Sequence, residues 1–385
     1  MGRVRRPLVV MADGPDAPLP DPAVVASAAG LDDAEILLGW VVREPEWVAN
    51  TPFPVTTFLT GPGTRAAVAS GRVRASHTRL SAVPGLMAGR MKPAVAVVGA
   101  HESPAGWSLA HSPGFVRSAV SNAEKAIVER WPGPARPGFP SLDAPVHAVI
   151  DRSDPHDPLP SGAAGAEHRR IGELVASLVP EDATIQWGPG VVGASVVSAL
   201  RVPVRVRSGL VTDELVSLDA KGLLIAPAEA AYVWGGEGLQ AMIADERLLL
   251  RDVAVTHDLT AISRIEGFVA INTALQVGLD GCANVEVVKG RVVAGAGGHP
   301  DFCAGASRSP GGMSIVALQS TSGGTSTIVA QPDAVTTPRT DVDVVVTAHG
   351  IADLRGATPA ERRELIIGVA APQFREALRT ADPGG

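Results

Sequence analysis

The sequence lacks the features that several classes of protein require. It contains only two cysteines, Cys282 and Cys303, which are too few for a disulfide framework and fit a reducing compartment. We interpret both as small buried residues. The sequence also has no G-x-S-x-G elbow, no H-E-x-x-H pair and no Cys/His spacing typical of zinc. We therefore expect no nucleophile elbow of that type and no metal site.

Excess positive charge and long apolar runs are also missing. The formal net charge is −7, which argues against a nucleic-acid surface but leaves room for a local basic pocket around an anionic ligand. No segment approaches the ~20 consecutive apolar residues that cross a bilayer. The apolar run near the N-terminus covers only about four residues, too short for a signal peptide. We expect a cytoplasmic protein that binds neither nucleic acid nor membrane.

What the sequence does contain is a large apolar fraction in an α/β pattern. Its 385 residues are 45% hydrophobic, enough for a large core and two domains. Short apolar runs at Glu35–Leu38, Val55–Leu59 and Ala94–Val98 predict strands between turns rich in glycine and proline, and a turn-rich loop is expected after Val98. Residues 151–167 are dense in Pro, Asp, Gly and Ser. We therefore predict an N-terminal domain at 1–150, a linker at 151–167 and a C-terminal domain at 168–385.

The stretch from Ala183 to Leu224 organises the C-terminal half. It predicts a strand at Ala183–Trp187, a glycine turn, a helix at Val191–Leu200 and a second strand at Val204–Arg207. Glycine in such a turn lets a phosphate or thioester approach the backbone N–H groups, and the following helix N-terminus adds a partial positive charge. This stretch is the first candidate for an anion or thioester site.

The same turn also satisfies the dinucleotide pattern G-x-G-x-x-G formally. Its glycines are Gly188, Gly190 and Gly193, and Asp213 follows 20 residues after Gly193. In a dinucleotide fold, however, the acidic residue ends the second strand. Here Asp213 comes after a further turn, inside the next predicted helix, so the match to a dinucleotide site is weaker than the spacing alone indicates.

The C-terminal third continues the alternation. Strands are predicted at Phe268–Asn272, Val285–Val288, Ser314–Gln319, Ser326–Val329 and Val342–Thr347, and helices at Pro359–Ile367 and Pro372–Leu378. Thr358 precedes a proline at the first helical position, and Glu361 lies three residues after it. That spacing predicts a capping box at this helix.

Several motifs in this half carry a family resemblance. They are Ala294–Phe302 (AGAGGHPDF), Gly305–Ser309, Gly312–Leu318, Val335–Asp343 (VTTPRTDVD), Gly350–Gly356 and Phe268–Val277. Together they resemble the acetyl-CoA hydrolase/transferase family, the branch of class I CoA-transferases that includes 4-hydroxybutyrate CoA-transferase. The resemblance covers nearly the whole chain and is densest between about 168 and 378.

The resemblance implies two similar open α/β domains with the active site at their interface. It also implies an acyl-CoA as substrate, no permanently bound cofactor, a small carboxylate as possible acceptor, and a homo-oligomer. In the family a loop like the glycine turn binds CoA and the thioester carbonyl. The residues that match these positions are Gly188, Pro189, Gly190, Val191, Val192, Leu275, Gly297 and Gly298.

The sequence departs from the family at the nucleophile. Family transferases use a glutamate that attacks the acyl-CoA carbonyl and becomes a glutamyl-CoA thioester, in a run like H-S-E-M-I-S-D-G. Aligned without a gap, Arg207–Val211 falls on that run and Gly209 occupies the glutamate position. Glycine has no carboxylate, so the covalent route of the family has no nucleophile at this position.

Three interpretations of Gly209 stay open. In the first, the vacated space admits water or another acceptor, activated by Asp213 or Glu214 nearby, or by Glu102 or Glu129 of the N-terminal domain. In the second, the protein binds CoA esters without turnover or acts as a partner subunit. In the third, the loop is rebuilt and another acid reaches the carbonyl. Asp213 and Glu214 are equally explained as acids in the first turn of a helix, and Glu129 as a structural residue.

Two histidines are further candidates for a general base. His299 directly follows Gly298, and His349 precedes Gly350. Imidazole suits proton transfer near neutral pH, although the family places no catalytic histidine at either position.

Overall fold

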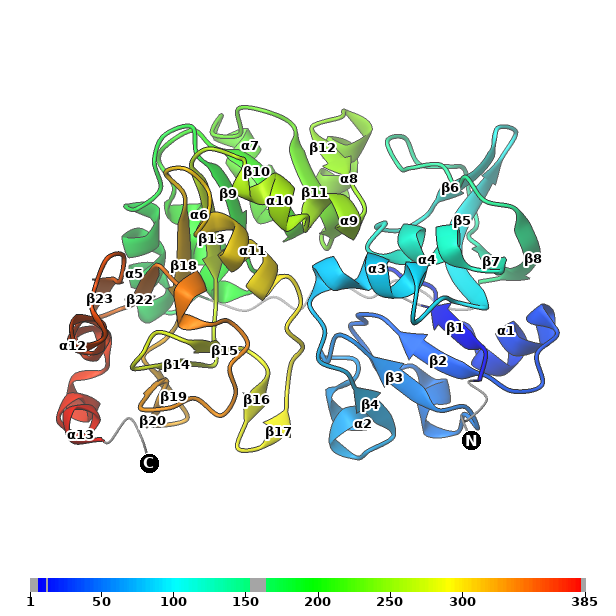
Figure 1. Cartoon of the computed structure of the whole chain (residues 1–385). Coiled ribbons are helices and arrows are strands. Elements are labelled where there is room, and N and C mark those ends of the chain that lie inside the picture. Colours follow the sequence, from blue (N-terminus) through cyan, green and yellow to red (C-terminus); the bar gives the residue numbers. More distant parts are fainter. Residues whose placement is uncertain (1–5, 12, 153–163, 382–385) are drawn as a thin grey trace. The chain divides into compact units, whose positions relative to one another are not determined.

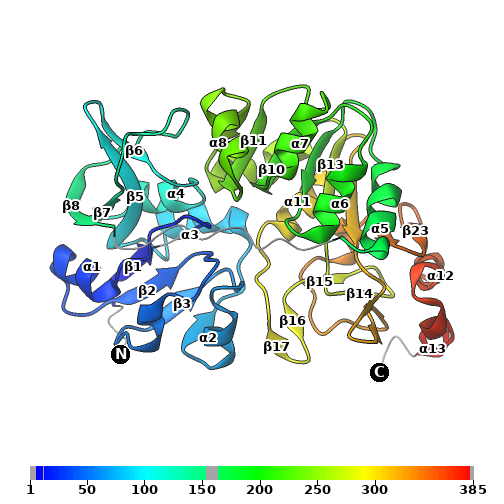
Figure 2. The ribbon, with the colours of Figure 1, turned by 180° about the vertical axis from the view of Figure 1, so that it is seen from behind.

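The computed structural model describes residues 6–11, 13–152 and 164–381. These residues form two compact units, each built on a mostly parallel sheet with helices packed against it (Figures 1 and 2). The first unit takes the described residues of 1–159 with 229–256 and 292–297, and the second takes those of 160–228, 257–291 and 298–385. The predicted α/β class is confirmed. Most of the predicted linker, 153–163, lies outside the described residues, and the domain division at 151–167 stays a prediction.

The first unit has a sheet in the order β4-β3-β2-β1-β5-β7-β8, in which neighbouring strands run parallel. Its strands are β1 (Leu8–Met11), β2 (Glu35–Leu38), β3 (Val55–Thr57), β4 (Val73–Ala75), β5 (Val95–Ser103), β6 (Gly106–Leu109), β7 (Lys125–Arg130), β8 (Val146–Asp151), β11 (Ala228–Val233, from Glu229 on) and β12 (Leu248–Leu250). Its helices are α1 (Pro22–Ala29), α2 (Arg65–Ala69), α3 (Val83–Ala88), α4 (Val116–Asn122), α8 (Glu237–Ala244) and α9 (Val253–Thr256), with 3-10 turns at Glu46–Ala49 and Leu80–Ala82.

The segment after Val98 corrects one expectation. A turn-rich loop is predicted there, but β5 continues to Ser103 and pairs antiparallel with β6, with Ala100 opposite Leu109 and Ser103 opposite Gly106. Only Pro104 and Ala105 form the turn between the two strands. The pairing with β6 supplies hydrogen bonds to this backbone. His101, Glu102 and Ser103 therefore lie on a strand and not in an open loop.

A buried carboxyl explains why residues 229–256 pack with the N-terminal segments. Asp13, which is fully buried, accepts hydrogen bonds from the backbone N–H groups of Phe115 (2.8 Å) and Trp40 (3.2 Å) and from the Tyr232 hydroxyl (2.8 Å). Burial raises the pKa of Asp13 to about 7. The backbone N–H of Val233 also donates to the Ser112 hydroxyl (2.9 Å). These contacts join parts of the chain that are far apart in sequence.

The second unit has a sheet in the order β10-β9-β13-β18-β22-β23, parallel except for the last pair. Its strands are β9 (Thr184–Trp187), β10 (Arg205–Val211), β13 (Phe268–Asn272), β14 (Gln276–Gly278), β15 (Ala283–Asn284), β16 (Val287–Val288), β18 (Met313–Ala317), β19 (Thr321–Ser322), β20 (Thr325–Ser326), β21 (Ile328–Val329), β22 (Val344–Thr347) and β23 (Gly350–Asp353), and β17 (Arg291–Val292) lies where the chain passes to the first unit. Its helices are α5 (Ala166–Ala176), α6 (Val191–Ala199), α7 (Glu214–Ala220), α10 (Leu259–Ser263), α11 (His299–Ala306), α12 (Pro359–Val369) and α13 (Arg375–Thr380), with 3-10 turns at Arg339–Asp341 and Pro372–Phe374.

The central strands of this sheet are covered on both faces. Every residue of β13, β18 and β22 is buried, as expected for parallel strands with nearly continuous apolar sequences. Helix α11 lies in front of β13 and β18 in Figure 1, and α5 and α6 lie in front in Figure 2. Helices α5 and α6 approach each other closely at Gly172, where the absence of a side chain leaves room for the α6 backbone. A Cβ on Gly172 would lie only 2.5 Å from the Ser195 carbonyl oxygen.

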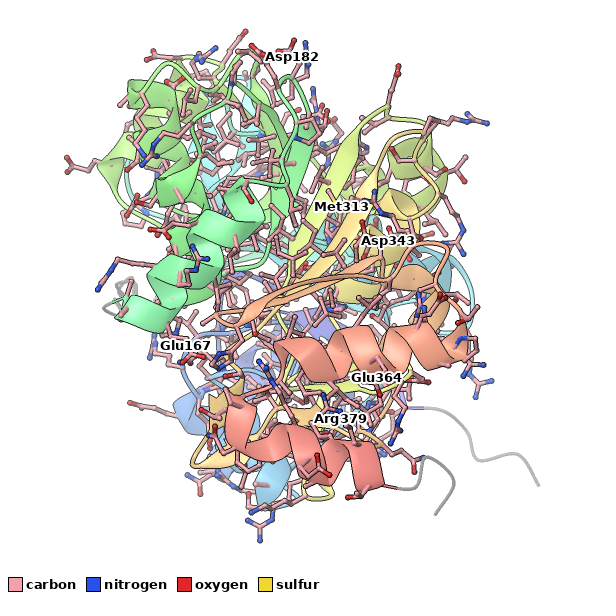
Figure 3. The ribbon with its side chains drawn as sticks, turned by 90° about the vertical axis from the view of Figure 1, so that its left-hand side faces the viewer. Glu167, Asp182, Met313, Asp343, Glu364 and Arg379 are labelled. Atoms are coloured by element: carbon pink, nitrogen blue, oxygen red, sulfur yellow. The ribbon has the colours of Figure 1, made fainter. Side chains whose placement is uncertain are left out.

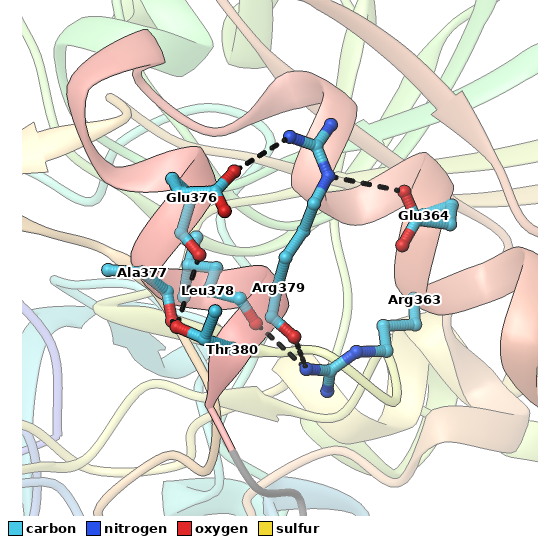
Figure 4. Close-up of polar contacts among 7 residues, drawn as sticks. All are labelled: Arg363, Glu364, Glu376, Ala377, Leu378, Arg379 and Thr380. Carbon is cyan, nitrogen blue, oxygen red and sulfur yellow. Dashed lines mark hydrogen bonds and ion pairs between the residues drawn. The ribbon is translucent and has the colours of Figure 1, made fainter.

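The last two helices close one side of the second unit, with Glu364 on α12 beside Arg379 on α13 (Figure 3). The capping box predicted at the start of α12 is confirmed, with Thr358 and Glu361 in the expected exchange. Arg363 Nη2 donates to the carbonyl oxygens of Leu378 (2.8 Å) and Arg379 (3.1 Å) at the end of α13 (Figure 4). A cation at a helix C-terminus is favourable because the last carbonyls carry partial negative charge.

Candidate active site

The glycine turn follows β9 and starts α6, as the sequence predicts. Gly190 has φ +109°, a conformation that favours glycine, and it is the N-cap of α6. A Cβ on Gly193 would lie 2.1 Å from the Gly188 carbonyl oxygen, so only glycine allows the helix to pack on this turn. The first N–H groups of a helix have no partner inside the helix, and the helix dipole favours an anion beside them. The turn therefore suits a phosphate or a developing oxyanion.

A buried amide pair holds the ends of β9 and β13 together. Gln186 Nε2 donates to Asn272 Oδ1 at 3.2 Å, and Asn272 Nδ2 donates to Gln186 Oε1 at 3.1 Å. A Cβ on Gly188 would lie 3.8 Å from the same Asn272 oxygen. This pair fixes the edge of the sheet from which the glycine turn leaves.

Gly209 lies in β10 at the same edge. Strand β10 is in register with β9 at Arg205 opposite Thr184, so Gly209 is level with Gly188, where the turn begins. The Ser208 hydroxyl donates to the Trp187 carbonyl oxygen (3.4 Å), which agrees with this register. Carboxyl ends of parallel strands are the usual place for ligands in open α/β sheets.

The space beside Gly209 is filled by an imidazole ring. A Cβ on Gly209 would lie 3.0 Å from His257 Nε2 and 3.2 Å from Phe302 Cε2. A Cβ on Gly298 would lie 2.5 Å from the same His257 nitrogen. His257 therefore lies directly beside Gly209, and two glycines make room for its ring. The entry of water or another acceptor at Gly209 stays a prediction.

His257 is a neutral, buried histidine at neutral pH. Its side chain is 1% exposed, and its ring centroid lies 4.8 Å from that of Phe302. Burial lowers the pKa of His257 to about 3, and the positive charge of Arg207 acts in the same direction. His257 precedes the short helix α10, which packs against α11 (Figure 1). Sequence reasoning missed this residue, because a single histidine between two short helices carries no motif.

Residues 237–381 match the family described as acetyl-CoA hydrolase/transferase C-terminal domain. This part of the chain is similar to the acetyl-CoA hydrolase/transferase family. The resemblance predicted from the motifs is thereby confirmed, and so is an acyl-CoA-processing enzyme at the level of the family.

Relatives of the acetyl-CoA hydrolase/transferase family extend the similarity beyond those residues. The chain is 29% identical to the 4-hydroxybutyrate coenzyme A transferase of Clostridium kluyveri over 348 residues, which are 85% of this chain and 81% of that protein. It is 38% identical to the acetyl-CoA hydrolase of Kluyveromyces lactis over 138 residues, 34% of this chain and 26% of that protein. RipA from Yersinia pestis has the same fold, with a TM-score of 0.86 and 24% identity over 97% of this chain and 93% of that structure. The relatives' names include both transfer and hydrolysis, so the family alone does not choose between them.

The acids predicted near the site lie in ordinary local contacts. Asp213 immediately precedes α7, and Glu214 in the first turn accepts a hydrogen bond from the Thr212 hydroxyl. Glu129 lies on β7 in the first unit, where it is 2% exposed and accepts a hydrogen bond from Trp131 Nε1 at 3.0 Å. Their catalytic roles stay predictions.

The other predicted ligand positions lie in loops and at a helix start. Pro189 is exposed, and Val191 and Val192 are half-buried in the first turn of α6. Leu275 follows β13 and is half-buried, with its N–H donating to the Asn284 carbonyl oxygen (2.8 Å). Gly297 has φ +56°, and Gly298 is the N-cap of α11. Their contacts with CoA stay predictions.

The two cysteines and His299 are buried, as the interpretation of the cysteines predicts. Burial raises the pKa of Cys303 to about 12 and lowers that of His299 to about 4, so both are neutral at neutral pH. His299 Nδ1 lies 2.8 Å from the Thr337 hydroxyl, and Cys303 Sγ lies 3.6 Å from His299 Nδ1. A thiol with so high a pKa is a poor nucleophile.

In residues 6–11, 13–152 and 164–381, no group of three or more His, Cys, Asp or Glu side chains is placed to hold a metal ion. In the same part of the chain, no helix has the length and apolar character needed to span a bilayer.

Acidification is expected to destabilise the protein through its buried histidines. The folded pKa values of His257 and His299 are about 3 and about 4, whereas the unfolded chain binds these protons at about 6.5. Below that pH the unfolded state binds more protons, so the free energy of unfolding falls by up to ~1.4 kcal/mol per pH unit for each histidine until its folded pKa is reached.

Urea unfolding at several pH values between about 7 and 5 measures this slope. Replacement of His299 by glutamine should reduce it. Asp13, with its pKa raised to about 7, contributes in the opposite sense, but it is common to wild type and variant and cancels in the comparison. If wild type and His299→Gln showed the same slope, the lowered pKa of His299 in the folded protein would be contradicted.

Proposed function

We propose that this protein hydrolyses an acyl-CoA thioester without forming a glutamyl-CoA intermediate. The observation that carries this proposal is Gly209, which stands where the family has its glutamate and whose free side is occupied by the His257 ring. A glutamyl-CoA thioester requires a carboxylate that can attack the acyl carbonyl. With glycine at this position, direct attack by water on the thioester is the simplest remaining reaction.

The glycine turn supports the same reaction. Its backbone N–H groups, at the start of α6, suit the oxyanion that forms when a nucleophile adds to the thioester carbonyl. One such donor typically contributes about 10²–10³-fold to the rate. Acyl-CoA is in this proposal a substrate and not a resident cofactor, and a small carboxylate is its product.

Thiol release from a panel of acyl-CoAs, with and without acetate, tests the proposal. We expect wild type to release free CoA at a rate that acetate does not change, because water is the acceptor. Borohydride and hydroxylamine, which trap a protein-bound thioester, should leave the protein without a CoA adduct. A trapped adduct on any glutamate, or release that depends on acetate, would show transfer through a carboxylate and overturn the proposal.

We also propose a second function, because glycine at position 209 has no carboxylate that could act as the nucleophile. The protein would then bind CoA esters without turnover, alone or as a partner subunit. Calorimetric binding of an acyl-CoA by a protein that releases no thiol would favour this function over hydrolysis. With either function, we expect the protein to form a homo-oligomer and to lie in the cytoplasm. Light scattering on the purified protein tests the oligomer.

A further inference from the structure

One buried carboxyl group joins three separate segments of the first unit. Oδ1 of Asp13 accepts a hydrogen bond from the backbone N–H of Trp40 (3.2 Å). Its Oδ2 accepts from the backbone N–H of Phe115 (2.8 Å) and from the Tyr232 hydroxyl (2.8 Å). Gly114 has φ +47°, and a Cβ there would lie 2.2 Å from the same Oδ2. Only glycine at this position leaves room for the carboxyl.

Residues 229–256 are held to the N-terminal segments by backbone hydrogen bonds around the same carboxyl. The Gly114 N–H donates to the Ala231 carbonyl oxygen (3.1 Å), and the Val253 N–H donates to the Gly114 carbonyl oxygen (2.9 Å). These bonds form only while residues 229–256 lie against the N-terminal segments. The two amides therefore report whether this part of the chain is docked.

The charge around Asp13 favours its protonated form. In the part of the chain that the structure describes, the hydrogen-bond donors to Asp13 are neutral, and the charged group that faces it is the Asp252 carboxyl. Asp252 is half-buried, accepts hydrogen bonds from the Ser118 hydroxyl (3.0 Å) and N–H (3.2 Å), and is itself faced by Arg117. Burial raises the pKa of Asp13 to about 7 against the opposing effect of its three donors, and the Asp252 charge adds to the rise.

We propose that Asp13 and Tyr232 form a latch, which holds residues 229–256 more tightly when the carboxyl is protonated than when it is ionised. The Tyr232 hydroxyl suits both states, because a hydroxyl donates to a carboxylate and accepts from a protonated carboxyl. When the latch opens, the carboxyl meets water and its pKa returns to about 3.8. The docked state therefore binds the proton more strongly, and the latch weakens as the pH rises from about 4 to about 7.

The latch is connected to the candidate active site through the chain. Residues 229–256 end at Thr256, and the next residue, His257, lies beside Gly209. Acidic conditions thus hold the residue before His257 in place, and neutral conditions leave it more mobile. The latch does not depend on which reaction occurs beside Gly209, because all of its contacts lie in the first unit.

Residue-resolved hydrogen exchange of wild type between about pH 5 and 8 measures the latch. The probes are the amides of Gly114, Val233 and Val253, with each rate divided by the intrinsic rate at that pH. We expect the ratio of open to closed forms to rise roughly 50-fold between about pH 5 and 7 and to level off above it. The Ala110 amide, which donates to the Gly99 carbonyl oxygen (3.0 Å), is the reference and should not follow. A ratio that does not change with pH would overturn the proposal.

Tyr232 provides a second probe because it is the only tyrosine of the chain. Tyrosine labelled with ¹³C at Cζ gives a single NMR signal from the carbon that bears the hydroxyl. Its chemical shift should titrate with a midpoint near pH 7 in wild type, as the carboxyl beside it ionises, and should not titrate there in Asp13→Asn.

Asp13→Asn removes the titrating proton and keeps an acceptor oxygen. In this variant the open-to-closed ratio should change by less than about threefold between about pH 5 and 7. His111, whose pKa burial lowers to about 4, is common to both proteins and cancels in the comparison. The same rise in wild type and Asp13→Asn would show that Asp13 is not the titrating group.

If Asp13→Asn does not fold, Tyr232→Phe takes its place. The hydroxyl bond lowers the pKa of Asp13, so its loss should move the midpoint of the rise to higher pH. A contact that is merely structural would change the protection of the amides and leave the midpoint where it is in wild type, and that result contradicts the latch.

Asp252→Asn separates the two buried carboxyls. It should keep the rise and move the midpoint to lower pH, because one neighbouring negative charge is lost. If Asp252→Asn abolishes the rise while Asp13→Asn retains it, the latch titrates at Asp252 and our assignment is wrong.

Discussion

Replacement of Gly209 by glutamate alone is expected to destabilise the protein and to leave it without transferase activity. The new side chain would start 3.0 Å from His257 Nε2, in a space that the ring already fills. Overpacking of a buried site together with a crowded carboxylate should lower the free energy of unfolding by ~3 kcal/mol. Urea unfolding measures this loss, and thiol exchange from acyl-CoA to acetate measures the activity.

The double variant Gly209→Glu with His257→Gly should reverse both effects. Removal of the ring opens the space for the glutamate, so stability recovers and the family's nucleophile regains its position. We then expect exchange that depends on acetate and a glutamyl-CoA adduct that borohydride traps. His257→Gly alone is the matched control and should show neither. Full stability of Gly209→Glu by itself would contradict the packing that we describe around His257.

Replacement of Gly193 by alanine should disable the glycine turn. The added Cβ would lie 2.1 Å from the Gly188 carbonyl oxygen and 3.0 Å from Trp187 Cδ1, so the turn and the start of α6 must move apart. We expect a loss of roughly 3 kcal/mol in the free energy of unfolding, because a backbone atom cannot yield as a flexible side chain can. The affinity for CoA, measured by titration calorimetry, should fall by at least about tenfold, or ~1.4 kcal/mol.

Gly368 provides the matched control for that variant. It lies inside α12, and a Cβ there has no neighbour within 4 Å. Gly368→Ala should therefore leave CoA affinity unchanged and stabilise the helix by up to ~1 kcal/mol. If Gly193→Ala bound CoA as tightly as wild type, the turn would not be part of the CoA site.

Local pattern predicts much of this fold correctly. The apolar runs at Glu35–Leu38 and Phe268–Asn272 coincide with β2 and β13, and the glycine turn and the capping box at Thr358 form where predicted. These features depend on residues that are close in sequence, through hydrophobic periodicity, backbone freedom of glycine and short-range capping hydrogen bonds. Such signals need no knowledge of the rest of the chain.

The parts that local pattern does not predict involve distant partners. The hairpin of β5 and β6 exists because two short strands pair across Pro104 and Ala105, where composition alone indicates a loop. Residues 229–256 join the N-terminal segments through contacts such as Tyr232 with Asp13, 219 positions apart (232 minus 13). No periodicity within either segment specifies such a partner.

The candidate site, like the fold, could be predicted from the sequence only in part. The sequence by itself determined the family resemblance and the glycine turn before a helix, and it led to the prediction that Gly209 occupies the family's glutamate position, because each depends on residue identity along one stretch. Only the tertiary structure decided which side chain lies beside Gly209. His257 follows Gly209 by 48 residues (257 minus 209) and reaches it because β10, α10 and α11 pack at one edge of the sheet and two glycines leave room for an imidazole ring. Close packing of distant segments fixes that contact, and residue spacing along the chain does not encode it.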